Sequence, residues 1–382
     1  MKKAFYFGLA GIALFEILRV YFIMPMPGSQ GIESVGLAYF IHTWRWGFRV
    51  VFLLMIVAGV RAAFGIRHRW VPAAALLLAV LVTWLFNFRL TAESMFRQPQ
   101  VLSFAPRERS AVDESSVVVG VEHNGEAKAY PIRFLVYHHQ VPDSVGGKPV
   151  LVTYCSVCRT GMVFDPIVNG HPETFRLVGM DHFNAMFEDR ATGSWWRQAT
   201  GEAIVGPLKG TNLTEIPSDQ LTAREWFTLH PHGVIMQPDP TSLGGYDSRG
   251  VFERGESTSA LTGTDHGSWN DKSWVVGIEA SGAARAYDWN RLKDERVIND
   301  RVGGTPIVLA LATDQQSFAA FERPDGSATF AMEGNVLSSA GHAYDLAGRD
   351  LADPQRCLKK LPASQEFWHS WRTFHPGTSQ DR

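Results

Sequence analysis

Residues 118–152, VVGVEHNGEAKAYPIRFLVYHHQVPDSVGGKPVLV, decide the fold because a close copy of them follows later in the chain. Residues 275–309 read VVGIEASGAARAYDWNRLKDERVINDRVGGTPIVL and align with the first stretch without a gap, at a constant offset of 157. The residues of the first copy that recur in the second are Gly120, Glu122, Gly125, Ala129, Tyr130, Leu135, Asp143, Val145, Gly146, Gly147 and Pro149. Two copies are too few for a solenoid, so we expect a duplicated domain with a pseudo-twofold axis.

The two copies also end alike. LTEIPSDQLTAREWFTLHP begins at Leu213, and LKKLPASQEFWHSWRTFHP begins at Leu358, at an offset of 145. The second copy is therefore shorter by 12 residues in its middle. We predict repeat one at 114–240, a linker at 241–270 and a degenerate repeat two at 271–382, with a connector at 92–113 before them.

Local patterns within each copy indicate an α+β class that is rich in β-strands. Alternating apolar residues flank Asn124-Gly125 in the first copy and Ser281-Gly282 in the second, which is typical of a β-hairpin. A short helix is expected around residues 132–137, and Gly146-Gly147 then turns the chain into the apolar strand PVLVTY.

Three apolar runs precede the duplicated part and predict a helical membrane anchor over residues 1–91. They cover residues 4–24, 47–64 and 70–90, and the second run can start as early as Leu37. The first run resembles a signal peptide, but no small-residue cleavage site follows it. We therefore expect three transmembrane helices and a lipid bilayer as partner.

Basic residues near these runs predict the orientation. Lys2 and Lys3 precede the first run, and three arginines lie between the second and third, whereas the loop at 25–36 has no Lys or Arg. By the positive-inside rule the N-terminus is cytoplasmic, and the part after the third helix is extracytoplasmic. In a bacterium this places the domain in the periplasm, on the outer side of the inner membrane.

Charged residues also fall within or beside the apolar runs. Glu16 and Arg19 lie in the first run, and His42, Arg45 and Arg49 recur at helical spacing before the second. Such residues either pair with one another and reach the interface, or line a proton or ligand path.

Composition excludes several classes of protein. The chain of 382 residues is 45% hydrophobic and 19% charged, which is ordinary for a folded protein and unlike a disordered one. The net charge of −2 argues against a nucleic-acid partner, and three cysteines are too few for a disulfide-dense scaffold.

The duplication acts as an internal control for chemistry, because residues kept in both copies are explained by the scaffold. Cys155 and Cys158 in TYCSVCRTGMVFD align with Ala312 and Gln315 of the second copy. His138 and His139 likewise align with Glu295 and Arg296. These four residues of the first copy are therefore candidates for function.

Three interpretations of the Cys155-x-x-Cys158 motif compete. It can form a structural disulfide in an oxidising compartment, or a redox-active pair, although no following helix is expected to stabilise a thiolate. It can also bind a metal with a histidine from His138, His139 or His182, and with Met162 or Met180 as further donors. Thiolate, imidazole and thioether together suit copper, and zinc is the alternative. We expect a metal- or cofactor-dependent site, with an oxidoreductase and a non-catalytic copper-handling module as the functional alternatives.

A second candidate region is DRATGSWWRQATGEAIVGPL, residues 189–208. Trp196, Arg197 and Glu202, together with Arg159 beside the cysteines, are candidate cofactor-binding residues. The alternative is that the two tryptophans are core residues and the charges form surface ion pairs.

These motifs together resemble a bacterial and archaeal domain-of-unknown-function family. The resemblance rests on AYP, TYCSVCRTGMVFD, TGEAIVGPL and the final W…HP, and it covers about residues 93–376. Family members usually show His-Glu where this chain has His138-His139, and an Asn near the position of His182. The resemblance implies no established activity, but both departures add histidines to the candidate site.

The sharpest expectation concerns convergence. Cys155, Cys158 and at least one of the three histidines should share a pocket in the first copy, and the aligned place in the second copy should lack ligands. Adjacent residues of a helix cannot both face the same side, so only one of His138 and His139 should point inward. We favour His138, because it occupies the usual histidine position of the family.

Overall fold

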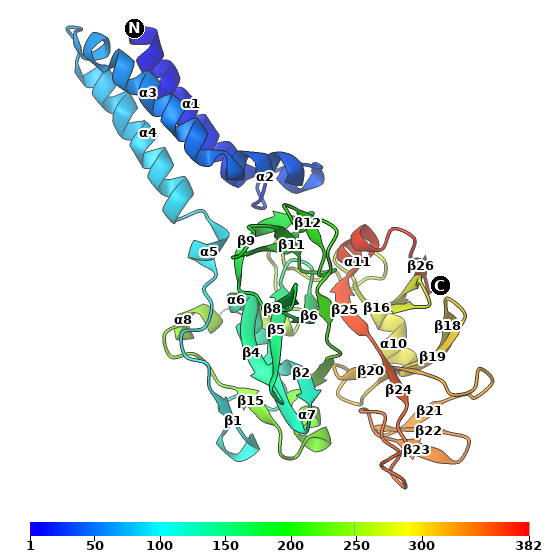
Figure 1. Ribbon diagram of the computed structural model, residues 1–382. Coiled ribbons are helices and arrows are strands. Elements are labelled where there is room, and N and C mark those ends of the chain that lie inside the picture. Colours follow the sequence, from blue (N-terminus) through cyan, green and yellow to red (C-terminus); the bar gives the residue numbers. More distant parts are fainter. Residues whose placement is uncertain (248, 382) are drawn as a thin grey trace. The chain divides into compact units, whose positions relative to one another are not determined.

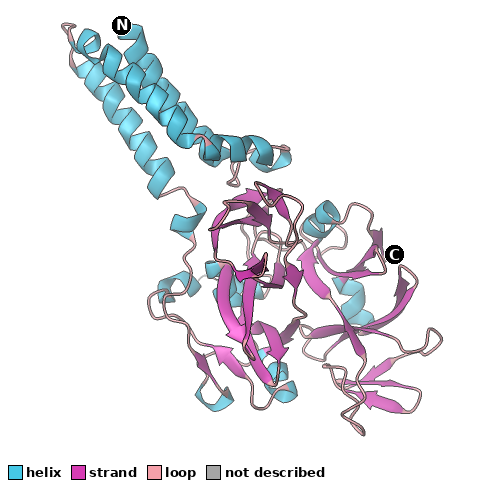
Figure 2. Ribbon diagram, viewed as in Figure 1, coloured by secondary structure: helices cyan, strands magenta, loops and turns pink. Residues whose placement is uncertain are grey.

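The structure is a computed structural model that describes residues 1–247 and 249–381 (Figure 1). The described chain divides into two compact units. The first contains residues 1–97, 175–197 and 202–211, and the second contains 98–174, 198–201 and the chain from 212 onward. Helices dominate the beginning of the chain and strands dominate the rest (Figure 2).

Three long helices of the first unit confirm the predicted number of apolar spans. α1, α3 and α4 are each long and apolar enough to cross a membrane, and they run side by side in Figure 1. The second apolar run is divided at Trp44, so that its early part forms a separate short helix. The helices of this unit are α1 (Lys2–Tyr21), α2 (Val35–Thr43), α3 (Arg45–Phe64), α4 (Trp70–Phe88) and α5 (Ala92–Met95).

Two glycines let α1 and α3 approach closely. A Cβ atom on Gly59 would lie 2.5 Å from the backbone nitrogen of Phe5, and one on Gly8 would lie 2.8 Å from the carbonyl oxygen of Phe52. Small residues at such contacts are typical of helices that pack in membranes.

A four-stranded antiparallel sheet completes the first unit, although its sequence lies within predicted repeat one. Its strands follow the order β12-β11-β10-β9. The Met180 amide of this sheet donates to the carbonyl of Ile23, just after α1, at 2.7 Å. The strands are β9 (Phe175–Asp181), β10 (Asn184–Asp189), β11 (Trp195–Arg197) and β12 (Ala203–Val205).

The second unit repeats one order of elements, strand–strand–helix–three strands and then strand–helix–strand. The first set is β2 (Val117–His123), β3 (Glu126–Pro131), α6 (Ile132–His138), β4 (Gln140–Val145), β5 (Lys148–Cys155), β6 (Thr160–Asp165), β14 (Asp219–Thr222), α7 (Ala223–Leu229) and β15 (Val234–Met236). The second set is β16 (Trp274–Ala280), β17 (Ala283–Asp288), α10 (Trp289–Glu295), β18 (Val297–Val302), β19 (Thr305–Leu311), β20 (Phe318–Glu322), β25 (Ala363–Phe367), α11 (Trp368–Phe374) and β26 (Ser379–Gln380). We call these sets the first half and the second half.

Strand registers agree between the halves at the offsets of the sequence alignment. Val118 pairs with Pro131, and Val275 pairs with Asp288. The closing strands agree as well, since Val118 also pairs with Leu221 while Val275 pairs with Glu366. Both halves end with a short parallel strand, β15 beside β3 and β26 beside β17.

Each half also places a glycine under the ring of the tryptophan that recurs in both copies. A Cβ atom on Gly120 would lie 2.3 Å from Trp226, and one on Gly277 would lie 2.1 Å from Trp371. No side chain fits at such distances, so glycine at these positions allows each terminal helix to pack against its strand.

Short elements occupy the predicted connector and linker. β1 (Phe104–Ala105) of the connector pairs with β15, and the linker contains α8 (Leu243–Tyr246) and α9 (Gly250–Glu253). The remaining strands are β7 (Ile167–Val168), β8 (His171–Pro172), β13 (Thr214–Glu215), β21 (Ala331–Glu333), β22 (Val336–Ser339), β23 (His342–Tyr344) and β24 (Lys359–Leu361).

Candidate functional site

The two motif cysteines lie at a hairpin turn. β5 and β6 are antiparallel, Cys155 pairs with Thr160, and residues 156–159 form the turn between them. Both cysteine side chains are completely buried, at 0% exposure. The apolar run of β5 explains the burial up to Cys155, because five of the six residues before it are also buried or half-buried hydrophobic residues. We call residues 155–160 the cysteine turn.

Residues of the second half hold the cysteine turn in place. The Phe367 amide donates to the carbonyl of Cys158 at 2.8 Å. The carbonyl of Val157 accepts a hydrogen bond from Lys272 Nζ at 2.9 Å and lies 3.1 Å from His369 Nε2. Lys272 Nζ also lies 3.2 Å from His369 Nε2. The backbone between the two cysteines is thus fixed by side chains that lie more than a hundred residues away in sequence.

The ammonium group of Lys272 couples electrostatically to the thiols. Burial lowers the pKa of Lys272, and the thiols of Cys158 and Cys155 partly oppose this shift. The coupling is mutual, so the charge of Lys272 acts on both thiols. Burial and then Lys272 lower the pKa of His369 to about 4, which keeps this imidazole neutral at neutral pH.

Arg159 completes the turn in a left-handed backbone conformation, with φ of 60°. Its side chain is only 2% exposed, and its guanidinium lies 3.6 Å from the centre of the Trp274 ring. Its three nitrogens donate to Gln365 Oε1 at 3.0 Å and to the carbonyls of Phe252 at 3.0 Å and Glu253 at 2.9 Å. Arg159 therefore anchors the cysteine turn; its predicted cofactor role stays a prediction.

The predicted histidine ligands have other neighbours. His138 Nε2 lies 2.6 Å from the hydroxyl of Tyr246. The carbonyl of His139 accepts from the amide of Tyr154, the residue before Cys155, at 3.0 Å, and burial lowers the pKa of its imidazole to about 4. His182 belongs to the other unit, where it lies 2.6 Å from Asp181. The predicted convergence of these rings on the cysteines stays a prediction.

A metal site in a protein needs several donor side chains that lie close together. Among residues 1–247 and 249–381, no three or more His, Cys, Asp or Glu side chains form a group that could hold a metal ion. The absence of such a group among these residues favours chemistry of the two thiols over a closed metal site, which needs three or four protein ligands.

The other predicted cofactor-binding residues all lie in the first unit, where Arg197 and Glu202 share a network and Trp196 bonds elsewhere. Arg197 donates to Asp181 Oδ2 at 2.9 and 2.6 Å, and Glu202 lies 3.6 Å from Arg197. The indole of Trp196 is buried and donates to Asp189 at 2.9 Å. Asp181 thus links Arg197 to His182. The core-tryptophan alternative describes Trp196 well, and a cofactor role for Arg197 and Glu202 stays a prediction.

Comparison with known proteins assigns the chain to a family. The profile of a family described as "Protein of unknown function (DUF3179)" matches residues 97–378. The chain belongs to the DUF3179 family. No curated protein and no solved structure matches it. The match confirms the resemblance seen in the sequence and begins just after the anchor helices of this DUF3179 protein.

A group of acidic residues near the cysteine turn was missed by the sequence analysis. Glu366 of β25 is 2% exposed, and the hydroxyls of Ser364 and Ser370 each donate to its carboxylate at 2.8 Å. Thr160 of the cysteine turn also hydrogen-bonds Glu366. Burial raises the pKa of Glu366. Three consecutive residues of β25, 365–367, therefore each contact a residue of the hairpin turn.

Glu366 lines a cavity of about 250 Å³ together with Glu215, Glu279 and His375. Although Glu215 keeps an exposed side chain, desolvation in this recess and then the carboxylates of Glu279 and Glu366 raise its pKa to about 7. His375 lies 3.1 Å from Glu279, and this pairing raises the pKa of His375 against the effect of burial. Such groups can exchange protons near neutral pH.

The internal control could have found part of this group. At the offset of 145, Glu215 aligns with Lys360 and Glu366 aligns with Leu221, so both carboxylates occur in one copy alone. Glu279 and His375 have counterparts in Glu122 and His230, whose side chains lie 3.6 Å apart.

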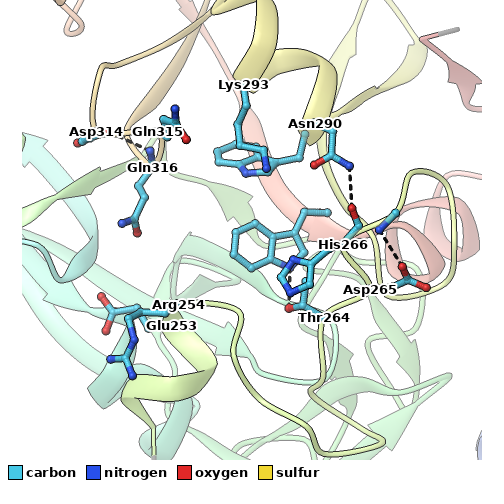
Figure 3. A pocket seen from close by; sticks show the side chains of 13 residues that line it. Glu253, Arg254, Thr264, Asp265, His266, Asn290, Lys293, Asp314, Gln315 and Gln316 are labelled. Atoms are coloured by element: carbon cyan, nitrogen blue, oxygen red, sulfur yellow. Dashed lines mark hydrogen bonds between the residues drawn. The ribbon is translucent and has the colours of Figure 1, made fainter.

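A larger cavity of about 370 Å³ adjoins Trp274, the residue that Arg159 stacks on. Its lining includes Trp289, Lys293 and the turn at 314–316. Figure 3 shows Lys293 and Asn290 near the top, the 314–316 turn to the left of Lys293, and Glu253 and Arg254 below that turn. This turn aligns with residues 157–159, so the second half uses the counterpart of the cysteine turn to line an open cavity.

Proposed function

We propose that this DUF3179 protein is a membrane-anchored, extracytoplasmic thiol–disulfide protein, in which Cys155 and Cys158 interconvert between dithiol and disulfide. The observation that carries the proposal is the burial of both cysteines at one turn beside the ammonium group of Lys272. The first and fourth residues of a tight turn lie within about 7 Å at their Cα atoms, which is the separation that disulfides span.

The proposed redox step transfers two electrons from the two thiols to a partner disulfide. The thiols of Cys155 and Cys158 lose two protons and two electrons and form one S–S bond. A disulfide of a partner protein or small molecule takes up these electrons and protons and becomes two thiols. Because both cysteines are buried, the turn has to open before a partner can exchange with them. The redox state of the pair would then control the contact between Cys158 and Phe367.

Metal binding remains the second candidate, because thiolates and imidazoles are ligands for copper or zinc. The predicted set of Cys155, Cys158, His138, His139 and His182 would supply the site, with copper handling or oxidoreductase activity as its use. The donor arrangement in the described residues favours the dithiol proposal over this one.

One experiment separates the two candidates. Full-length protein in detergent is equilibrated at a series of glutathione redox potentials, quenched in acid and labelled with a mass-tagged maleimide, and its copper and zinc contents are measured in parallel. A Cys357→Ser background removes the exposed third cysteine. We expect two labels in the reduced protein and none in the oxidised protein. One metal per chain that is lost in Cys155→Ser, with both thiols retained at every potential, would overturn the thiol proposal.

The extracytoplasmic location is part of the proposal. Support comes from the three apolar helices and from the positions of Lys2, Lys3 and the arginines between α3 and α4. Fusions of a reporter that is active only in the periplasm test it at the C-terminus. An inactive reporter at that end, with an active one in the loop at residues 65–69, would place the domain in the cytoplasm.

We also propose that the two halves arose by duplication. The support is the agreement of strand registers and of the Gly120–Trp226 and Gly277–Trp371 contacts at the two alignment offsets. An experimental structure in which residues 118–152 and 275–309 superpose supports this; unrelated folds of the two stretches contradict it.

A further inference from the structure

A cavity of about 240 Å³ lies within the first unit, where the end of α1, the start of α3 and the end of α4 meet β9. Its lining combines three guanidinium groups and one carboxylate with apolar side chains. The charged residues are Arg19, Arg45, Arg176 and Glu93, and the apolar ones include Val20, Ile23 and Leu177. Sites with this mixture suit ligands that carry a negative group on an apolar body.

One carboxylate pairs with Arg19, which lines the cavity, and with Arg49 of α3. Glu16 is completely buried, and its two oxygens lie 3.1 Å from Arg19 Nε and 2.7 Å from Arg49 Nε. Asn87 joins this network, because its side-chain oxygen accepts from Arg19 at 2.6 Å and from Arg49 at 2.7 Å. A single negative charge therefore faces two positive charges.

On the other side of the cavity one arginine faces two carboxylates. Arg176 lies 2.6 Å from Glu188 and 3.4 Å from the more exposed Glu93. His42 lies 3.2 Å from Glu188, and its burial lowers its pKa, so the imidazole adds no full positive charge near neutral pH. Neither Glu188 nor Glu93 forms an ion pair with Arg45, the remaining arginine of the cavity.

Arg45 carries the excess charge. Its Nη1 donates to the carbonyl of His42 at 2.6 Å, and no carboxylate within the described part of the chain lies within ion-pair distance of it. Trp44 and Trp46 on either side are 59% and 66% exposed. Exposed tryptophans at the end of an apolar helix mark the headgroup level of a bilayer, so Arg45 lies at that level.

We propose that this cavity binds the headgroup of an anionic membrane phospholipid, with Arg45 and Arg19 contacting the phosphate and Val20, Ile23 and Leu177 contacting the glycerol end. The volume holds a headgroup and not an entire lipid. A guanidinium group recognises a phosphate through two parallel hydrogen bonds, and Arg45 has donors available for them. The site is independent of the cysteine turn.

Short-chain lipids provide the test. Full-length protein in a non-ionic detergent is titrated with dihexanoyl phosphatidylglycerol, with dihexanoyl phosphatidylcholine and with inorganic phosphate, and bound ligand is counted by native mass spectrometry. We expect one phosphatidylglycerol per chain, bound at least about tenfold more weakly by Arg45→Gln than by the original protein. Arg61→Gln removes the same charge from the other end of α3 and should change the affinity by less than about twofold.

Other outcomes decide against the proposal. Equal affinity for phosphatidylglycerol and phosphatidylcholine, or an unchanged affinity in Arg45→Gln, overturns the role of the excess charge. Inorganic phosphate bound as tightly as phosphatidylglycerol overturns the apolar half of the site. Arg45→Lys keeps the charge without the planar group, and we expect an affinity between those of the original protein and Arg45→Gln, which guards against a variant that fails to fold.

Discussion

The turns at 155–160 and 312–317 occupy matching places in the two halves but differ in their surroundings. The first is buried, with Cys155 and Cys158 at 0% exposure, and it is held by Lys272, Phe367 and His369. The second lines an open cavity, and Gln315, the counterpart of Cys158, is exposed. The same hairpin therefore supports both turns, and the cysteines occur at the one that the opposite half covers.

The largest expected effect tests how strongly the cysteine turn depends on its anchor. Arg159→Met leaves the carbonyls of Phe252 and Glu253 without their buried donor and removes the contact with Trp274. We expect a loss of about 3 kcal/mol or more in the free energy of unfolding, measured by urea denaturation of the full chain in detergent.

Gln316→Met is the matched control in the second half. Gln316 is the counterpart of Arg159 and lines the open cavity, so its replacement should change stability by less than about 0.5 kcal/mol. Equal losses in the two variants would show that burial of the turn is not what distinguishes the halves.

The next effect tests whether the halves share a scaffold. Gly120→Ala would place a methyl group 2.3 Å from the ring of Trp226, and Gly277→Ala would place one 2.1 Å from the ring of Trp371. We expect both to destabilise the protein by about 1–3 kcal/mol, because the ring and its helix have to shift. Gly377→Ala meets no atom within 4 Å and serves as the control. A large loss in one half alone argues against equivalent packing.

A third prediction concerns the ionisation of Glu215, a carboxylate that is absent from the aligned position of the second copy. The pKa of Glu215 is about 7 in the folded protein and near 4.5 in a model compound. Between these values the folded state binds one proton more than the unfolded state, so this group makes the free energy of unfolding fall as pH rises from about 5 to 7. Glu215→Gln should flatten that fall in denaturation curves taken from pH 5 to 8.

Lys360 is the counterpart of Glu215 and pairs with Asp219. Lys360→Gln removes a charge at the same place in the other half and should leave the fall between pH 5 and 7 in place. If the two variants show the same pH profile, the recess around Glu215 does not control its ionisation.

The sequence predicted the fold of each half better than the contacts between the halves. Alternating apolar residues and the Asn-Gly and Gly-Gly turns predicted the hairpins, and hydropathy predicted the three long helices. The contact of Lys272 and His369 with Val157 crosses from one half to the other. No local pattern encodes such a contact, because it depends on how the two halves pack.

The same limit explains the small sheet. Residues 175–211 lie between parts of repeat one in sequence, yet most of them belong to the compact unit of the anchor helices. The tryptophans and charges of this segment predicted either a cofactor pocket or a core with ion pairs. Which of these forms depends on the partner of the sheet, and the amide of Met180 bonds to Ile23, which is distant in sequence.

The smallest expected effect compares the two histidine–glutamate pairs. His375 lies 3.1 Å from Glu279 and its pKa is raised, whereas His230 lies 3.6 Å from Glu122 and burial lowers its pKa. A raised histidine pKa gives stability that is present below the unfolded value of 6.5 and is lost as pH rises through the folded value.

Because Glu279 is largely exposed, Glu279→Gln should cost only about 0.5 kcal/mol at pH 6 and almost nothing at pH 9. Glu122→Gln should show a weaker pH dependence, since burial lowers the pKa of His230 and so leaves less of its imidazole charged at pH 6. Denaturation curves of both variants at pH 6 and pH 9 check this, and a larger loss for Glu122→Gln at pH 6 would reverse the order of the two pairs.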